Sequence, residues 1–214
     1  MDTGIILIRH GETEWNKEEI FRGRSDIPLN KNGLAQAAAM ADSLKDLELK
    51  AVYCSPLSRA RQTAEALCRG RNLKPQNREA FIDLSFGPWE GKSYKELARL
   101  QPEQIRLWQE QPHRHGLPGV EPLNDALERS FPEMEALAEA NLGGNIAIVS
   151  HRVILKLLLL AAMNLGSESF WMIKQDPCCI NMLEYHREKG FIIARINESC
   201  HLKPPAASFR KIDF

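Results

Sequence analysis

The sequence predicts an α/β fold with a mostly parallel sheet, and two observations support this prediction. Short apolar runs rich in β-branched side chains, at residues 5–8 and 145–149, indicate strands that are buried on both faces. Along the chain, such runs alternate with longer stretches whose apolar residues follow a helical pattern. This alternation is typical of parallel strands connected by helices that pack on the sheet.

The first part of the chain carries local signals for the ends of its elements. Asn30 precedes an Ala- and Leu-rich stretch at residues 31–44 and is a suitable N-cap for a helix there. Residues 51–54 form a second predicted strand. Ser55 and Pro56 follow it, and we expect Ser55 to cap a second helix with Pro56 at its first position.

The later part of the chain continues the same alternation. The predicted elements are a helix at 93–110, a loop at 111–122, a helix at 123–141, a strand at 145–149, a helix at 153–164 and two strands at 178–185 and 191–196. Pro132 is expected to kink or interrupt its helix. We expect one domain over residues 1–214, with a small cap inserted at about 81–122 and an irregular tail from residue 203.

Composition and charge limit the classes of function. The chain has 214 residues, of which 43% are hydrophobic and 26% charged, values that are ordinary for a globular domain. Its 28 basic and 28 acidic side chains give a formal net charge of zero. A protein that binds nucleic acid without sequence preference needs a basic field, so we predict no nucleic-acid partner.

Cysteine usage and hydropathy indicate the compartment. The five cysteines are odd in number and no two have C-x-x-C spacing, which argues against a disulfide framework or a zinc site. The longest apolar run, at 153–163, is interrupted by Lys156 and is too short to span a bilayer. We therefore predict a cytoplasmic protein with no membrane association.

Two histidines follow two of the predicted buried strands directly. His10 comes after the strand at 5–8, and His151 comes after the strand at 145–149. In parallel sheets, ligands bind beyond the carboxyl ends of the strands, where neighbouring strand ends meet. A lone histidine is more often a structural residue, but two in equivalent places predict one shared site.

Five motifs around these histidines resemble those of the histidine phosphatase superfamily, which is phosphoglycerate mutase-like in fold. In chain order they are RHGETEWN at 9–16, SPLSRARQTA at 55–64, GPWEG at 87–91, PGVE at 118–121 and IVSH at 148–151. The fourth has a valine where the family usually has a second glycine. The resemblance implies a three-layer αβα sandwich with a small cap, and an enzyme that acts on phosphate esters.

Residues that match the family's phosphate-binding positions are mostly arginines. The resemblance assigns Arg9 and Arg59 to the phosphate, which planar guanidinium groups hold through paired hydrogen bonds. Arg59 also falls in the first turn of its predicted helix, where the helix dipole favours an anion. Asn16 and the Arg22–Gly23 backbone are expected to add neutral donors.

By the same resemblance, His10 attacks phosphorus and becomes a phosphohistidine, while His151 stabilises charge in the transition state. His10 must be neutral to attack, and its second ring nitrogen needs a hydrogen-bond acceptor that sets the tautomer. The family's general acid is usually a glutamate, and the matching position here is Asp83. Glu79 and Glu90 are alternatives, although we expect Glu90 to be a hydrogen-bonding partner in a turn.

Two further positions are candidate contacts to the substrate. Arg152 stands where a glycine commonly follows the second histidine, and it either recognises a second anionic group or points away as a surface arginine. His201 lies in an N-x-x-C-H-L segment that resembles one in some phosphoserine phosphatases of this superfamily, and could approach the site. The resemblance implies no metal and no cofactor.

We predict a metal-independent phosphatase of a small phosphorylated metabolite. Cofactor-dependent phosphoglycerate mutases resemble the chain but generally carry a longer insertion between Asp83 and the second histidine. A mutase is the second hypothesis, and a non-catalytic phosphate-binding module is the third. The sequence names no substrate among phosphoserine, α-ribazole phosphate and sugar or glycerate phosphates, and it leaves a homodimer open.

Overall fold

A computed structural model describes residues 1–202, so the tail predicted from residue 203 lies outside the described residues. One six-stranded sheet has the order β3-β2-β4-β1-β5-β6. Its strands are β1 (Thr3–Arg9), β2 (Ala51–Cys54), β3 (Gln76–Asn77), β4 (Asn145–Ser150), β5 (Ile180–His186) and β6 (Gly190–Glu198). β1, β4, β2 and β3 pair in parallel, whereas β5 is antiparallel to β1 and to β6. The predicted α/β fold with a mostly parallel sheet is confirmed.

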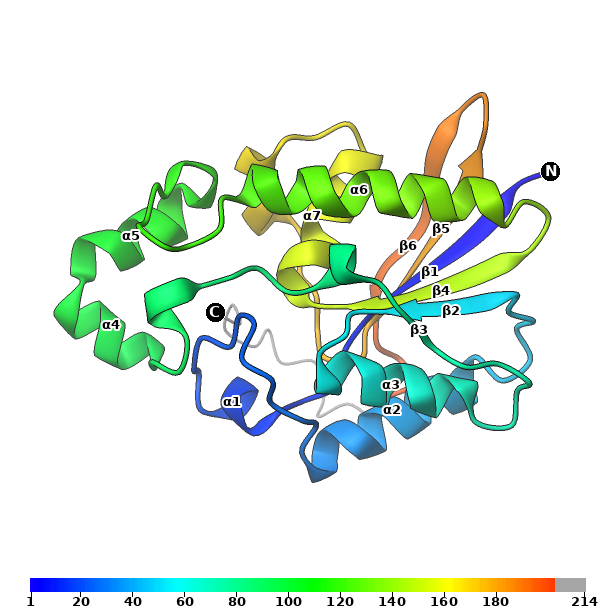
Figure 1. Cartoon of the computed structure of the whole chain (residues 1–214), viewed down its shortest axis with the longest axis horizontal. Coiled ribbons are helices and arrows are strands. Elements are labelled where there is room, and N and C mark those ends of the chain that lie inside the picture. Colours follow the sequence, from blue (N-terminus) through cyan, green and yellow to red (C-terminus); the bar gives the residue numbers. More distant parts are fainter. Residues whose placement is uncertain (203–214) are drawn as a thin grey trace.

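Helices cover both faces of this sheet, which gives three layers (Figure 1). α2 (Lys31–Ser43) and α3 (Ser58–Cys68) lie on one face, and α6 (Leu123–Ala140) and α7 (Arg152–Ala162) lie on the other. The shorter elements are α1 (Glu14–Lys17), α4 (Tyr94–Leu100), α5 (Pro102–Glu110) and the 3₁₀ turns η1 (Glu79–Phe81), η2 (Gly87–Trp89), η3 (Pro112–Arg114) and η4 (Ser167–Met172).

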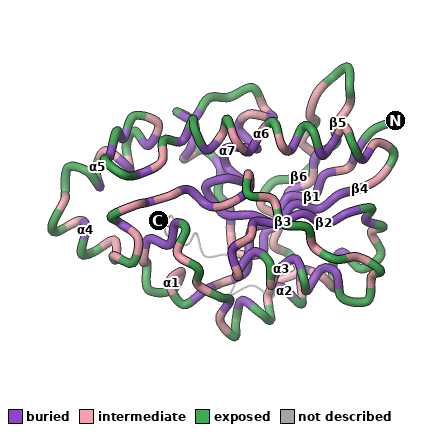
Figure 2. Tube along the Cα trace, viewed as in Figure 1, coloured by how far each residue is buried: buried purple, intermediate pink, exposed green. Residues whose placement is uncertain are grey.

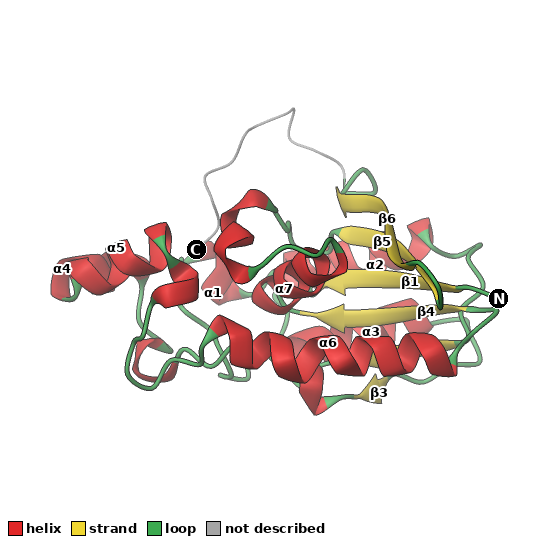
Figure 3. Cartoon of the chain, turned by 90° about the horizontal axis from the view of Figure 1, so that it is seen from above, coloured by secondary structure: helices red, strands yellow, loops and turns green. Residues whose placement is uncertain are grey.

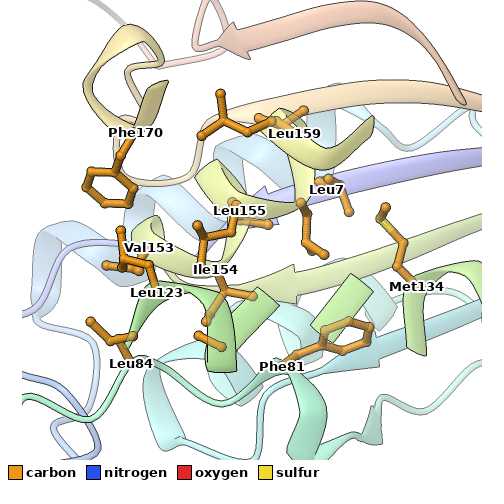
Figure 4. Packing of buried hydrophobic residues seen from close by; sticks show 14 of the residues in the cluster. Leu7, Phe81, Leu84, Leu123, Met134, Val153, Ile154, Leu155, Leu159 and Phe170 are labelled. Carbon is orange, nitrogen blue, oxygen red and sulfur yellow. The ribbon is translucent and has the colours of Figure 1, made fainter. Parts of the chain in front are cut away.

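The sheet is buried on both faces, as its apolar strands predict. Alternate residues of β1 point into different cores: Ile5 and Leu7 belong to the cluster under α6 and α7, and Ile8 belongs to the cluster under α2 and α3. Figure 2 shows the buried residues concentrated along the central strands. Figure 4 shows Leu7 in the first cluster with the apolar side chains of α7. Close packing on both faces fixes the positions of the strand ends and of the residues that directly follow them in the sequence.

Two predicted helix boundaries are wrong. Ser55 does not cap α3, because that helix begins three residues later, at Ser58, after Leu57. The Ser55 hydroxyl instead accepts a hydrogen bond from Leu57 N at 3.3 Å in a local turn. The helix predicted at 93–110 is two helices, because Pro102 starts α5 and the preceding residue, Gln101, cannot continue α4.

The helix through Pro132 is continuous, since α6 runs from Leu123 to Ala140 without a break. The N-terminus of α6 differs from that of α2. Asn30 caps α2 as predicted, because its side chain accepts a hydrogen bond from Gly33 N at 2.8 Å. The N-terminus of α6 has no side-chain cap. α6 is therefore held by its packing on the sheet rather than by its ends.

α4 and α5 lie beyond the carboxyl ends of the parallel strands in both side and top views (Figures 1 and 3). Both helices belong to the stretch at about 81–122 that the sequence predicts to be a cap inserted into a single domain. The single domain with an inserted cap stays a prediction. No helix within residues 1–202 combines the length and the apolar character that crossing a membrane requires.

Candidate active site

The two histidines meet at the carboxyl ends of neighbouring parallel strands. Arg9 of β1 is in register with Ser150 of β4, so the residues after them lie side by side. His10 N donates to Ser150 O at 3.0 Å, and the ring centroids of His10 and His151 are 5.2 Å apart. The structure thus brings together the two residues that the sequence placed at equivalent strand ends.

His10 has the tautomer that a nucleophilic imidazole needs. Its Nδ1 lies 2.7 Å from Gly11 O, and since a carbonyl can only accept, Nδ1 carries the proton. The lone pair is then on Nε2. Burial, and then the positive charges of Arg59, Arg9 and Arg22, hold the pKa of His10 well below its ordinary value of 6.5. His10 is therefore neutral near pH 7, and its Nε2 can attack an electrophile.

His151 uses both ring nitrogens for contacts within the protein. Arg59 Nε donates to His151 Nδ1 at 3.2 Å, so the proton is on Nε2, which donates to Ser55 Oγ at 2.7 Å. Burial, followed by Arg59, lowers the pKa of His151 well below its ordinary value. His151 is therefore neutral and its ring orientation is set at both ends.

Arg59 organises the centre of the site from the first turn of α3. Its guanidinium is fully buried and donates to Ser25 O at 2.8 Å and to Gly23 O at 2.7 Å. The same Nη2 lies 3.1 Å from Asp83 Oδ2, in a buried ion pair. Asp83 Oδ2 is also 3.6 Å from His151 Nδ1. One arginine thereby joins three segments that are far apart in the sequence.

The Arg59 contacts depend on the conformation of the loop before α2. Gly23 has φ of +50°, a left-handed conformation that a residue without Cβ adopts readily. A Cβ there would collide with the Glu90 carboxylate. Glu90 holds this loop by accepting hydrogen bonds from Arg24 N at 3.0 Å and Ser25 Oγ at 3.1 Å. Glu90 is thus the structural partner that the sequence led us to expect.

A cavity opens in front of His10 at this edge of the sheet. Its lining residues are His10, Phe21, Arg22, Gly23, Asp83, Phe86, Arg152 and Val153. Arg22 and Arg152 are both buried, with exposed fractions of 7% and 5%. Of the two orientations that the sequence left open for Arg152, the structure shows the one toward the site.

Arg9 and Asn16 are not among the residues that line the cavity. Arg9 is fully buried, and its Nη1 donates to Gln175 O at 2.6 Å. Asn16 Oδ1 accepts from Thr13 N at 2.9 Å in a capping box of α1. This contact turns Asn16 Nδ2 the other way, and that buried donor has no hydrogen-bond partner within residues 1–202. Asn16 therefore has a buried donor that is not used within the described residues, and its assignment to the phosphate stays a prediction.

Other candidate residues lie elsewhere. His201 Nε2 is 3.0 Å from Cys178 O, and His201 is not among the residues that line the cavity. Glu79 is exposed in η1, which leaves Asp83 as the acidic residue that faces His10. His115, which lies in the stretch predicted as a loop at 111–122, is buried against the Trp108 ring, at 5.7 Å between centroids.

Sequence reasoning missed two hydroxyl groups of the site. Ser55 is the residue after β2, and its hydroxyl holds His151, so its place at a strand end was the available signal. Thr63 Oγ1 accepts from Gly11 N at 3.1 Å and donates to Arg59 O at 2.8 Å. No local pattern distinguishes Thr63 from any other small residue on the buried face of a helix. Within residues 1–202, no group of three or more His, Cys, Asp and Glu side chains is suited to hold a metal ion.

Comparison with known proteins gives one family and several similar phosphatases. The profile of the histidine phosphatase superfamily (branch 1) matches residues 5–199. Phosphoserine phosphatase 1 of Hydrogenobacter thermophilus is 29% identical over 198 residues, which cover 92% of this chain and 93% of the relative. The adenosylcobalamin/α-ribazole phosphatase of Salmonella typhimurium is 28% identical, with 84% of this chain and 89% of the relative covered.

Solved structures share the fold over nearly the whole chain. YhfR of Bacillus stearothermophilus superposes with a TM-score of 0.88 at 28% identity, covering 93% of this chain and 98% of that protein. A phosphoserine phosphatase variant of Entamoeba histolytica in complex with phosphoserine has a TM-score of 0.80 at 25% identity, with 94% and 99% covered. The fold is therefore shared with these solved structures, one of which is a phosphoserine phosphatase.

Proposed function

The chain belongs to the histidine phosphatase superfamily, branch 1, and from this premise we propose that it is a metal-independent phosphatase of a small phosphomonoester. The reaction passes through a phosphohistidine on His10. The observation that carries this proposal is the neutral His10 ring, with Nδ1 bound to Gly11 O, in a cavity lined by arginines. Its similar relatives are phosphatases of phosphoserine and of adenosylcobalamin/α-ribazole phosphate.

In the first step, His10 Nε2 attacks phosphorus, the N–P bond forms and the ester P–O bond breaks. Arg22 in the cavity lining, together with the buried Arg59 and Arg9 whose charges also act on His10, neutralises the negative charge of the phosphoryl oxygens. The low pKa of His10 keeps its lone pair available. Besides burial, the same arginines cause this low pKa, because they repel an imidazolium. In the second step, the ionised Asp83 takes a proton from a water molecule, the water oxygen attacks phosphorus, and the N–P bond breaks to release inorganic phosphate and neutral His10.

In this proposal Asp83 binds a proton from solvent when the phosphate dianion displaces Arg59 from its carboxylate, and it passes that proton to the leaving oxygen. This carboxyl group faces the same cavity as His10 and is fixed by Leu84 N, which donates to Oδ1 at 2.9 Å. Arg59 donates to its other oxygen, and a bound phosphate dianion competes with Asp83 for that donor. Substrate binding thereby loosens the Asp83 side chain at the moment when it has to reach the leaving group. The shorter aspartate side chain is compatible with this role because Asp83 already lines the cavity.

Trapping the intermediate tests this proposal directly. The chain is mixed with p-nitrophenyl phosphate in EDTA, quenched in alkali and digested, and the peptide that contains His10 is analysed by mass spectrometry. We expect a phosphate adduct on His10 that is stable in alkali and lost in acid, and phosphate release that EDTA does not reduce. Loss of activity in EDTA with recovery on adding Mg²⁺, or a phosphorylated serine, would contradict the proposed mechanism.

A further inference from the structure

We propose that Arg129 is a positioning residue for Asp83, because its guanidinium fixes the loop that carries this carboxyl group, and that Glu121 holds the guanidinium in place. The proposal rests on the phosphatase function proposed above and on the proton transfer assigned there to Asp83. Neither Arg129 nor Glu121 is among the residues that line the cavity, so both act on the reaction through Asp83.

Asp83 lies in a segment without regular structure. Residues 82–86, between η1 and η2, belong to no helix or strand. Such a segment samples several backbone conformations unless contacts from elsewhere restrict it. Proton transfer requires the Asp83 carboxyl group within hydrogen-bond reach of the leaving oxygen. Contacts from outside the segment therefore have to set the position of Asp83.

Arg129 of α6 supplies two of these contacts from one planar group. Its Nη1 donates to Ala80 O at 2.7 Å, and its Nη2 donates to Asp83 O at 3.2 Å. Ala80 is in η1 and Asp83 is two residues after the end of η1, so both contacts are to the same short stretch. Buried side chains of α6 belong to the core cluster on its face of the sheet. The guanidinium thereby ties the loop to a helix that the core holds in place.

Glu121, the last residue of the PGVE motif, holds the guanidinium in a bidentate pair. Its Oε1 accepts from Arg129 Nε at 2.8 Å, and its Oε2 accepts from Arg129 Nη2 at 3.1 Å. Oε2 also accepts from Ser85 N at 3.1 Å, and Glu121 N donates to Ser85 O at 2.8 Å. Burial favours the protonated form, but the hydrogen bonds from Arg129 and Ser85 N outweigh it and hold the pKa of Glu121 below its ordinary value. The backbone is therefore held on both sides of Asp83.

These backbone contacts matter most when substrate is bound. In the proposed mechanism, the phosphate displaces Arg59 from Asp83 Oδ2, which lies 3.1 Å from its Nη2 in the free chain. The hydrogen bond from Leu84 N to Asp83 Oδ1 is a contact inside the segment, so it cannot set where the segment lies. The contacts from Arg129 are to backbone oxygens, and the displacement of Arg59 leaves them in place. Arg129 therefore holds Asp83 in both states.

Arg24 contacts the same two residues but is less suited to this role. Its Nε is 3.4 Å from Asp83 O, and its Nη2 is 3.2 Å from Glu121 Oε2. The Arg24 side chain is 42% exposed, whereas that of Arg129 is 23% exposed. Water and side-chain motion weaken contacts of exposed charges. We therefore assign the positioning to Arg129 and expect a smaller effect from Arg24→Gln.

Two leaving groups read the position of Asp83, because a basic leaving oxygen needs its proton more than an acidic one. kcat and KM are measured on phenyl phosphate and on p-nitrophenyl phosphate for the wild-type chain, Arg129→Gln, Arg129→Lys, Asp83→Asn and the double variant of Asp83→Asn with Arg129→Gln. The matched control is Arg78→Gln. Arg78 is 35% exposed and pairs with Glu133, which is also on α6, at 3.1 Å.

Hydrogen exchange followed by mass spectrometry reads the loop without turnover, on the peptide that contains residues 80–86. Urea unfolding confirms that each variant is folded. Glu121→Gln keeps the shape of the side chain and removes its charge, so it takes the place of Arg129→Gln if that variant does not fold.

We expect Arg129→Gln to lower kcat/KM by about 10-fold on phenyl phosphate, mainly through kcat, and by less than about two-fold on p-nitrophenyl phosphate. Arg129→Lys should stay closer to Arg129→Gln than to the wild-type chain, because one ammonium group cannot replace the fork of donors. Arg78→Gln should leave the ratio of the two substrates unchanged.

In the Asp83→Asn background, Arg129→Gln should cause no further loss on phenyl phosphate, because the group that Arg129 positions is already gone. Exchange in residues 80–86 should be faster in Arg129→Gln than in the wild-type chain, and unchanged in Arg78→Gln. Glu121→Gln should act in the same direction as Arg129→Gln on both readouts.

The proposal is overturned if Asp83→Asn separates the two substrates and Arg129→Gln lowers both equally, since Arg129 would then act elsewhere. Full recovery in Arg129→Lys, or a further loss in the double variant, would overturn it as well. If Asp83→Asn itself lowers both substrates equally, or if no chain releases phosphate, the function proposed for Asp83 or for the whole site fails instead. Hydrogen exchange then decides the positioning by itself, and unchanged exchange in Arg129→Gln would refute it.

Discussion

The ends of β1 and β4 are alike in sequence position and differ in what surrounds them. Each strand is buried, each runs in the same direction, and each is followed directly by a histidine. At the end of β1, His10 uses one ring nitrogen on Gly11 O and keeps Nε2 for the cavity. At the end of β4, His151 has one nitrogen on Arg59 and the other on Ser55.

The difference teaches that the role of an imidazole depends on its partners more than on its position. A ring with one donor contact to a carbonyl presents a lone pair and can form a bond to phosphorus. A ring held at both nitrogens is suited to position the arginine beside it. The proposed chemistry therefore assigns bond formation to His10, and the orientation of Arg59 and the stabilisation of charge to His151.

The sharpest test of this division is His10→Ala. We expect phosphate release from p-nitrophenyl phosphate to fall by at least about 10³-fold, because no other group at the strand end can accept phosphorus. The chain should remain folded, because the substitution removes an uncharged ring whose hydrogen bond is to the Gly11 carbonyl and keeps the backbone hydrogen bonds of residue 10. Circular dichroism and urea unfolding check the fold, and retained activity would refute the nucleophile assignment.

Removing the His151 side chain should lower the catalytic rate less than removing the His10 side chain. His151→Ala is expected to lower kcat by about 10²-fold while the phosphohistidine still forms, because transition-state stabilisation is weakened and the nucleophile remains. Ser55→Ala removes only the hydroxyl that holds the His151 ring, so we expect about a five-fold loss. Rapid-quench measurement of the phosphoenzyme distinguishes the steps. The comparison fails if His151→Ala abolishes phosphoenzyme formation as completely as His10→Ala.

Asp83 contacts Arg59 and lies near His151, and its role depends on the leaving group. Asp83→Asn should lower kcat/KM by about 10²-fold for an alkyl phosphate and by a few-fold for p-nitrophenyl phosphate, whose leaving oxygen needs no proton. Asp83→Glu should retain more of the alkyl phosphatase activity than Asp83→Asn. Equal losses on both substrates would assign Asp83 to the positioning of Arg59 instead of proton transfer.

The smallest expected effect is on stability at mildly acidic pH. The pKa values of His10 and His151 lie well below 6.5 in the folded chain and near 6.5 in the unfolded chain. Below pH 6.5 the unfolded chain binds more protons than the native one, so stability is full above that pH and is lost as pH falls.

Each histidine should therefore reduce the free energy of unfolding by up to about 1.4 kcal/mol per pH unit below 6.5, until its own folded pKa is reached. Urea unfolding of the wild-type chain and of His10→Gln at about pH 7.5 and about pH 5.5 measures this dependence. The variant should lose less stability between the two conditions. Equal losses would mean that His10 is protonated in the native state.

Much of this molecule was predictable from local patterns. The buried strands at 5–8 and 145–149 are β1 and β4, and Asn30 caps α2, because burial and capping depend on residues close in sequence. Where the predictions failed, a nearby competing signal was stronger. Pro102 divides the helix expected at 93–110, and Leu57 rather than Ser55 precedes α3.

The sequence by itself determined which chemical groups stand at the strand ends, because parallel strands must bring their carboxyl ends to one edge of the sheet. It could not determine which nitrogen of each histidine is free, that Arg59 pairs with Asp83, or that Arg152 turns toward the cavity. These features depend on side chains from distant segments competing for the same hydrogen bonds in a buried space. Only the packed tertiary structure decides that competition.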